Sequence, residues 1–169
     1  MLGSGAVGSR WIRNVWQTFR DQMELARLVD PNPAALREAG DWLGLPPAAR
    51  FADAREAFAA VDADYRCIVT PPKHHQEAVE LASDRGMDTL SETLIADTPE
   101  ACGAIARAVK VAGVRMMMTQ NYRYTRCILT LKQTVSELDA VSYAVARYVS
   151  KSRATARTFL LMSSTWDSA

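Results

Sequence analysis

The feature that most constrains the fold is a glycine-rich loop that begins at the third residue. Gly3-Ser4-Gly5-Ala6-Val7-Gly8 has the G-x-G-x-x-G spacing, which is typical of the turn between a β-strand and the helix that follows it. Only Met1 and Leu2 precede the loop, although a strand usually has roughly five or six residues. We therefore expect a sheet whose first, central strand is mostly missing, so that its two neighbours lack a shared hydrogen-bonding partner.

The residues after the loop fit a dinucleotide-binding unit. Apolar side chains recur at three- and four-residue intervals over residues 6–19, which predicts a helix there. The apolar run 25–29 predicts a strand, and Asp30 follows it at the place, about 20 residues beyond the glycines, where a carboxylate binds the adenosine ribose. The helix N-terminus would attract the pyrophosphate. The alternative is a tight turn followed by an ordinary Asp-Pro loop.

Strands and helices alternate along the rest of the chain. We predict strands at 65–69, 87–91, 114–118 and 140–149, and helices at 34–44, 53–60, 73–85, 98–112 and 124–137. This alternation favours an α/β fold with a Rossmann-type doubly wound parallel sheet of strand order 3-2-1-4-5-6. Asp88 fits poorly in a strand that is buried on both faces.

Composition excludes several classes of function. The net charge of +1 with 23% charged residues predicts neither a nucleic-acid nor a membrane partner. Cys67, Cys102 and Cys127 are widely spaced and form no C-x-x-C, which favours reduced thiols in a cytoplasmic protein and no metal site. His74 and His75 are adjacent, so on a helix they diverge and are expected at the solvated surface.

Four motifs together resemble those of the glucose–fructose oxidoreductase and inositol dehydrogenase (Gfo/Idh/MocA) family. They are the glycine loop, residues 29–33 (VDPNP), residues 70–75 (TPPKHH) and residues 120–124 (QNYRY). The resemblance implies an NAD(P)-binding Rossmann-type domain at 1–124, followed at 125–169 by a linker helix and the truncated start of an α+β domain for substrate binding and dimerisation. It further implies hydride transfer between a nicotinamide cofactor and a sugar, polyol or related small molecule.

The resemblance also assigns the cofactor contacts. They are Gly3, Gly5, Ala6, Val7 and Gly8 at the pyrophosphate, Asp30 at the adenosine ribose, Thr70, Pro71 and Pro72 along the nucleotide crevice, His75 in the motif's histidine place, Glu92 in the following motif, and Asn121 and Arg123 near the nicotinamide. Asp30 favours NAD over NADP, because its carboxylate would repel a 2′-phosphate.

Two departures bear on catalysis. Glu92-Thr93-Leu94 stands where the family has Glu-Lys-Pro, so Thr93 replaces the lysine that is expected to bind the reacting hydroxyl, and the catalytic residues stay unknown. The chain also ends about twenty residues after the strand predicted at 140–149, so we expect almost the whole of the family's second domain to be absent. We interpret the chain as an oxidoreductase-family protein that is impaired in this form. The alternative is a non-catalytic nucleotide-binding or oligomerisation module.

We expect unpaired strand edges at the first strand and at the strand predicted for 140–149. Either the reading frame starts a few residues late, or a partner or another segment supplies the first strand. The strand at 140–149 should lack the sheet that it would join, and residues 151–169 should form a loose polar tail. Because exposed edges pair with other chains, we expect a homo-oligomer, most simply a dimer.

Overall fold

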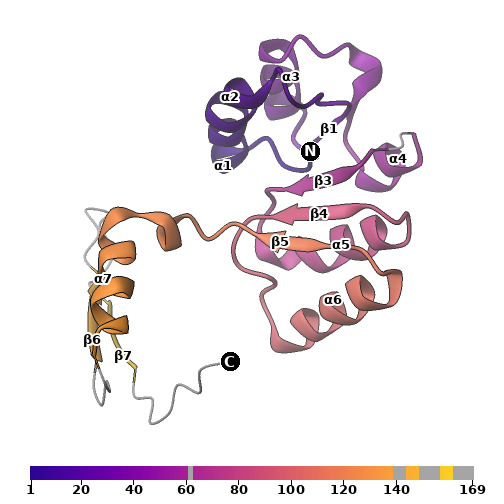
Figure 1. Ribbon diagram of the computed structural model, residues 1–169. Helices are drawn as coiled ribbons and strands as arrows, with labels where there is room; N and C mark the ends of the chain where they lie inside the picture. Colours follow the sequence, from indigo (N-terminus) through magenta and orange to yellow (C-terminus); the bar gives the residue numbers. More distant parts are fainter. Residues whose placement is uncertain (61–62, 139–143, 149–156, 162–169) are drawn as a thin grey trace. The chain divides into compact units, whose positions relative to one another are not determined.

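A computed structural model describes residues 1–60, 63–138, 144–148 and 157–161 (Figure 1). The chain divides into two units, Met1–Thr119 and Gln120–Ala169. The first is an α/β unit with parallel strands, and the second contains a helix and a two-stranded antiparallel sheet. Each is described by itself.

All strand pairs of the first unit are parallel. They are β1 (Leu28–Val29) with β2 (Arg50–Phe51), β3 (Tyr65–Ile68) with β4 (Asp88–Ser91), and β4 with β5 (Met116–Met118). Leu2 bridges β1 on one side and β3 on the other, as the position of the N-terminus in Figure 1 indicates. The spatial order is therefore β2-β1-Leu2-β3-β4-β5, which confirms the doubly wound Rossmann topology.

The short first strand retains part of its pairing. The Leu2 N–H donates to the Cys67 carbonyl (2.8 Å) and the Leu2 carbonyl accepts from the Val69 N–H (2.8 Å). On the other side, the Gly3 N–H donates to the Val29 carbonyl and the Val29 N–H donates to the Met1 carbonyl. The expectation that the two neighbours would lack a shared partner is thus wrong at this level of the sheet, because one residue with its flanking peptide groups still pairs on both edges.

The helix after the glycine loop is continuous but not uniform. It comprises α1 (Ala6–Arg10), the π-helical turn η1 (Trp11–Trp16) and α2 (Gln17–Phe19). A π-helix has a wider turn than an α-helix, with i→i+5 hydrogen bonds. It therefore brings Trp11 and Trp16, five residues apart, toward the same side, where both line one cavity.

Three further helices of this unit begin directly after residues whose side chains cap them. Asn32 caps α3 (Pro33–Trp42), Asp53 caps α4 (Ala54–Ala59) and Thr98 caps α6 (Pro99–Ala112), each by accepting backbone N–H bonds. The 3₁₀ turn η3 (Pro72–His74) leads into α5 (His75–Ser83). Gly86 and Gly113 both adopt left-handed φ angles after helices.

Two strands differ from expectation in informative ways. Strand β2 was not predicted, because its two residues after the 3₁₀ turn η2 (Pro47–Ala49) are too few to show a periodicity. In β4, Asp88 lies at the strand's start and accepts bonds from both the backbone and the guanidinium of Arg115. These bonds lower the pKa of Asp88 and explain how a carboxylate fits in this strand.

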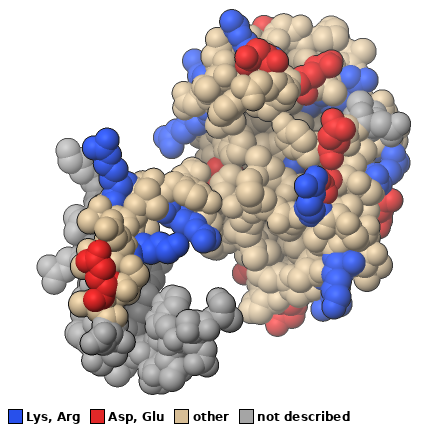
Figure 2. Space-filling model, viewed as in Figure 1, with Lys and Arg blue, Asp and Glu red and all other residues tan. Residues whose placement is uncertain are grey.

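The main core lies between the sheet and the helices that cover it. It includes Leu2, Phe58, Ile68, Val79 and Ile105, each at most 4% exposed. A second cluster of Ile12, Leu28 and Ala39 packs beneath the glycine-loop helix. On the face drawn in Figure 2, acidic and basic side chains of the first unit are interspersed rather than gathered by sign.

The second unit corrects one expectation. It contains η4 (Asn121–Tyr124), α7 (Arg126–Ser136), β6 (Ala144–Tyr148) and β7 (Arg157–Leu161). Strand β6 lies within the predicted strand, whose remaining residues are outside the described part of the chain, and it pairs antiparallel with β7. The predictions of an unpartnered strand and of a loose tail at 157–161 are therefore wrong. The homo-oligomer inferred partly from them stays a prediction.

The α-amino group of Met1 is buried at the start of the sheet and donates to the Arg27 carbonyl (2.7 Å). Desolvation of this ammonium is the main reason why its pKa falls from 8.0 to about 6. The folded protein therefore binds fewer protons at this group than the unfolded chain does between those two pH values.

We predict that the free energy of unfolding falls by on the order of 2 kcal/mol as the pH drops from 8 to 6, since the ammonium is costly only in the folded state. Urea unfolding across this range measures the effect. Acetylation of Met1 removes the titrating group and should flatten the profile. Identical profiles for the acetylated and free chains would contradict the assignment.

Candidate functional site

The glycine loop is packed tightly against the carboxyl end of β3. Gly3 has a φ of +94°, and a Cβ there would lie 2.6 Å from the Val69 carbonyl oxygen. A Cβ on Gly8 would lie 2.2 Å from the Gly3 carbonyl oxygen. Neither position accepts a side chain without backbone movement, so both glycines are needed for the turn itself.

Gly5 is different, because its surroundings are open. A Cβ at Gly5 would meet nothing within 4 Å, and its φ of −61° is ordinary for any residue. The first helical bond runs from the Ser9 N–H to the Gly5 carbonyl (2.7 Å). The N–H groups of Ala6, Val7 and Gly8 therefore precede the helical ladder and are the donors that a helix start offers to an anion.

Asp30 ties the end of β1 to the glycine loop. The residue is 8% exposed. Oδ2 accepts from the Ser4 backbone N–H (2.7 Å) and hydroxyl (2.9 Å), and Oδ1 accepts from the Asn32 N–H (2.8 Å). A carboxylate has about four acceptor positions. Asp30 thus holds the loop in place and retains acceptor capacity for one further donor.

His75 lies in the interior, which corrects the expectation of a solvated histidine. It is fully buried, with Nε2 2.8 Å from the Thr70 carbonyl oxygen and Nδ1 2.7 Å from that of Leu94. It therefore joins the loop after β3 to the loop after β4. Within the described residues the Thr70 hydroxyl is buried without a hydrogen-bond partner, and Pro71 and Pro72 follow it along the same loop.

Glu92 contacts the glycine-loop helix. Its backbone N–H donates to Ile68, Oε1 accepts from the Trp11 indole N–H (2.7 Å), and Oε2 accepts from the Thr93 N–H (3.1 Å). The bond to Trp11 spans 81 residues, and no sequence pattern indicated it. Thr93 itself is exposed.

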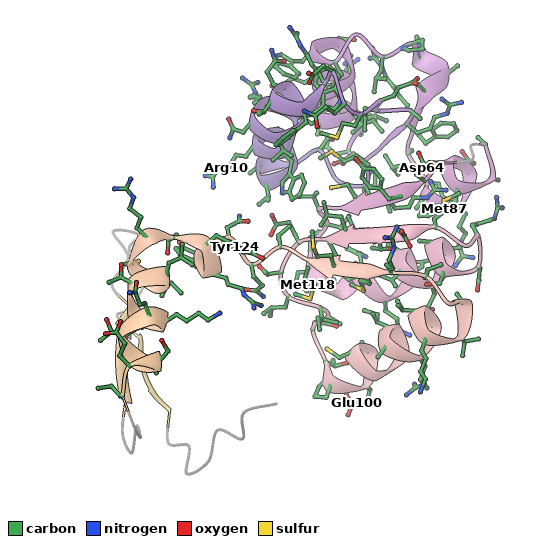
Figure 3. The ribbon with its side chains drawn as sticks, in the orientation of Figure 1. Arg10, Asp64, Met87, Glu100, Met118 and Tyr124 are labelled. Atoms are coloured by element: carbon green, nitrogen blue, oxygen red, sulfur yellow. The ribbon has the colours of Figure 1, made fainter. Side chains whose placement is uncertain are left out.

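These residues gather at one end of the sheet. The glycine loop, Asp30, Thr70 and Glu92 all follow the carboxyl ends of their strands, the end that Met118 marks in Figure 3. A cavity of about 200 Å³ adjoins the loop and is lined by the loop, its helix and α3. Asn121 and Arg123, also predicted as contacts, lie in η4 of the second unit and are exposed.

A larger cavity of about 430 Å³ lies elsewhere, along the segments that lead into β1 and β3. Asp64, which precedes β3, marks that end of the strands in Figure 3. Ligands of open parallel sheets bind outside the carboxyl ends of the strands. The smaller cavity, rather than the larger, therefore belongs to the candidate site.

The described residues also offer neither a metal-binding cluster nor a membrane-spanning helix. No group of three or more His, Cys, Asp or Glu side chains there is arranged to hold a metal ion. No helix there has both the length and the apolar character needed to span a bilayer.

Comparison with known proteins gives consistent matches. Residues 1–120 match the profile of an oxidoreductase family with an NAD-binding Rossmann fold. An uncharacterized protein, y4oX, of Sinorhizobium fredii is 39% identical over 140 residues, covering 79% of this chain and 38% of that protein. A D-apiose dehydrogenase of Paraburkholderia graminis is 31% identical over 128 residues, covering 76% and 33% respectively.

Solved structures match in fold. The WlbA dehydrogenase from Bordetella pertussis, determined with NADH and UDP-GlcNAcA, superposes with a TM-score of 0.74 at 24% identity, covering 80% of this chain and 40% of that one. The chain thus spans about a third to two fifths of the length of these relatives.

Replacing His75 tests how the two loops of the site are held. We predict that His75→Ala lowers the free energy of unfolding by about 2–4 kcal/mol, because it removes the ring that bonds the Thr70 and Leu94 carbonyl groups and leaves a cavity in its fully buried place. His74→Ala is the matched control, since the neighbouring ring is exposed, and it should have little effect. Equal urea midpoints for the two variants would contradict the role of His75.

Proposed function

The chain belongs to the Gfo/Idh/MocA family of oxidoreductases, which has an NAD-binding Rossmann fold, and on that premise we propose that its first unit binds NAD at the glycine loop. The observation that carries the proposal is the contrast among the three glycines. Gly3 and Gly8 are closely packed, whereas the space beside Gly5 is open next to the N–H groups of the helix start. A pyrophosphate needs this combination of free donors and close backbone approach.

The residues present fit the cofactor. Ala6, Val7 and Gly8 would donate backbone N–H bonds to the pyrophosphate, and the remaining acceptor position of Asp30 would take a ribose hydroxyl. Thr70, whose hydroxyl has no hydrogen-bond partner in the described part of the chain, would line the nucleotide crevice with Pro71 and Pro72. When bound, NAD supplies a nicotinamide ring that accepts or releases a hydride.

Of the other predicted contacts, one would position a loop of the site and three would lie at the nicotinamide end of the cofactor. His75 is a positioning residue, since its buried ring reaches the cofactor only through the Thr70 loop that it holds. Glu92, fixed by Trp11, would lie toward the nicotinamide end. Asn121 and Arg123 of the second unit would complete that end.

The reaction follows from the family. We propose hydride transfer between NAD and a sugar, polyol or related small molecule, a class that includes the D-apiose named for one relative. The exposed, neutral Thr93 in place of a lysine leaves turnover impaired in this chain. A non-catalytic nucleotide-binding or oligomerisation module is the alternative. Its supporting observation is the apolar face of α7, where Ile128, Leu131 and Val135 are exposed.

Location and assembly belong to the same proposal. The three cysteines are unpaired, in keeping with a reducing, cytoplasmic compartment. A homo-oligomer would cover the apolar face of α7 and extend the two-stranded sheet of β6 and β7, which is small for an independent sheet.

Calorimetry with both cofactors tests the binding site. NAD should bind more tightly than NADP, because the Asp30 carboxylate would repel a 2′-phosphate. Gly5→Ala should weaken NAD binding at least about tenfold, or roughly 1.4 kcal/mol, while leaving the unfolding midpoint nearly unchanged, since the added Cβ meets no protein atom.

Gly103→Ala in α6 is the matched control, because the only atom near its added Cβ is the end of the flexible Arg107 side chain. It should leave NAD affinity unaltered. Tighter binding of NADP would overturn the role of Asp30. Unchanged NAD affinity in Gly5→Ala would overturn the site.

A panel of sugars and polyols tests catalysis. We predict NADH formation near background for the 169-residue chain, because Thr93 cannot provide the positive charge of the family's lysine. Losing one electrostatic contact to the reacting group costs about 10²–10³ in rate. Thr93→Lys alone should not restore turnover if residues beyond the first unit are needed, and Thr130→Lys on α7 serves as the charge control. Robust NADH formation that Gly5→Ala abolishes would show that the impairment is wrongly proposed.

A further inference from the structure

Two acidic residues lie on opposite sides of the glycine loop. In the spatial order β2-β1-Leu2-β3-β4-β5 (Figure 1), Asp30 follows β1 and Glu92 follows β4, with the loop between them after Leu2. A dinucleotide lies across the crevice where the strand order reverses, with its pyrophosphate at the loop. In the proposed function Asp30 takes the adenosine ribose, so the nicotinamide half extends toward Glu92.

The backbone and the side chain of Glu92 are both held. Its N–H donates to the Ile68 carbonyl (2.9 Å), and its carbonyl accepts from the Ser91 hydroxyl (3.2 Å). In the side chain, Oε1 accepts from the Trp11 indole N–H (2.7 Å) and Oε2 accepts from the Thr93 N–H (3.1 Å). Trp11 belongs to the helix that begins at the glycine loop. Its bond therefore fixes the carboxylate relative to the loop.

Both donors to this carboxylate are neutral. They orient the group without offsetting its negative charge, and no ion pair in the described part of the chain includes Glu92. A carboxylate has about four acceptor positions, of which the two bonds occupy two, and the residue is half-buried. Glu92 is therefore a fixed negative charge that can still interact with a ligand.

We propose that Glu92 sets which oxidation state of the cofactor the site prefers, by favouring NAD⁺ over NADH. The inference rests on the proposed NAD site. The two forms differ by one charge, because the nicotinamide ring of NAD⁺ is positive and that of NADH is neutral. A fixed carboxylate at that end attracts only the first, by about three- to tenfold in affinity at a partly exposed site. Trp11 is a positioning residue, since it acts on the cofactor through Glu92.

The ratio of the two dissociation constants isolates this charge. Adenosine and pyrophosphate are identical in NAD⁺ and NADH, so the contacts of the glycine loop and of Asp30 cancel in the ratio. A merely structural role of Glu92 would alter both affinities together. A tenfold change in the ratio shifts the midpoint potential of the bound two-electron couple by about 30 mV, which gives an independent measurement of the same effect.

Calorimetry with the full chain tests the proposal, with NAD⁺ and NADH as the probes. Glu92→Gln keeps an acceptor for the Trp11 indole and removes the charge. We expect it to weaken NAD⁺ binding about tenfold and to change NADH binding less than about twofold. Glu100→Gln, which removes an exposed carboxylate of α6, is the matched control and should alter neither affinity.

Two further measurements examine how the charge is held and how it acts. Trp11→Phe leaves the carboxylate free to turn away, so it should move the ratio in the same direction as Glu92→Gln by about threefold. In the unaltered chain, raising the salt from about 0.05 M to about 0.5 M should lower the preference for NAD⁺, because salt screens a partly exposed charge. The ratio in Glu92→Gln should depend less on salt.

Three results would overturn the proposal: a ratio that Glu92→Gln leaves unchanged, equal weakening of both forms, or a ratio in the unaltered chain that does not depend on salt. An unchanged ratio in Trp11→Phe would overturn the positioning role. Failure of both forms to bind the unaltered chain would overturn the cofactor site itself, and this inference with it. The salt series needs no substitution, so the proposal stays testable if Glu92→Gln does not fold.

Discussion

The hydrogen bonds of Leu2 and its two flanking peptide groups join the halves of the first unit. Within the described residues, the backbone hydrogen bonds that join the β1–β2 pair to the three-stranded β3–β4–β5 sheet are those of Leu2 and its neighbours. The glycine loop begins at the next residue, so the hydrogen bonds that complete the sheet also fix where the loop starts. Its position is fixed further because Gly3 lies against the Val69 carbonyl, with no room for a side chain between them.

Polar side chains then hold the loops around this joint. Asp30 fastens the glycine loop to β1, His75 links the loops after β3 and β4, and Trp11 connects its helix to Glu92. Each of these contacts joins segments that are distant in sequence or on different elements. They leave the backbone N–H groups of the helix start facing outward. Dinucleotide recognition as proposed would therefore rely largely on backbone groups that side chains have preorganised.

The cavities beside the two ends of the parallel strands differ in size and lining. At the carboxyl ends of the strands, close packing of Gly3 and Gly8 leaves a small, polar recess. At the amino ends, a cavity more than twice as large is lined by Trp16 and Arg27, whose indole Nε1 and guanidinium Nε are buried without a hydrogen-bond partner within the described residues.

The sequence by itself determined the features that depend on neighbouring residues along the chain. The glycine spacing predicted the loop, Asp53 and Thr98 predicted helix starts, and alternation of elements predicted the Rossmann order, because capping, turns and periodicity are local properties. The tertiary structure alone decided the burial of His75, the bond between Trp11 and Glu92, the pairing of Asp88 with Arg115, and the strands β2 and β7. These depend on partners far away in sequence or on runs too short to show a period, and only the packed sheet brings them together.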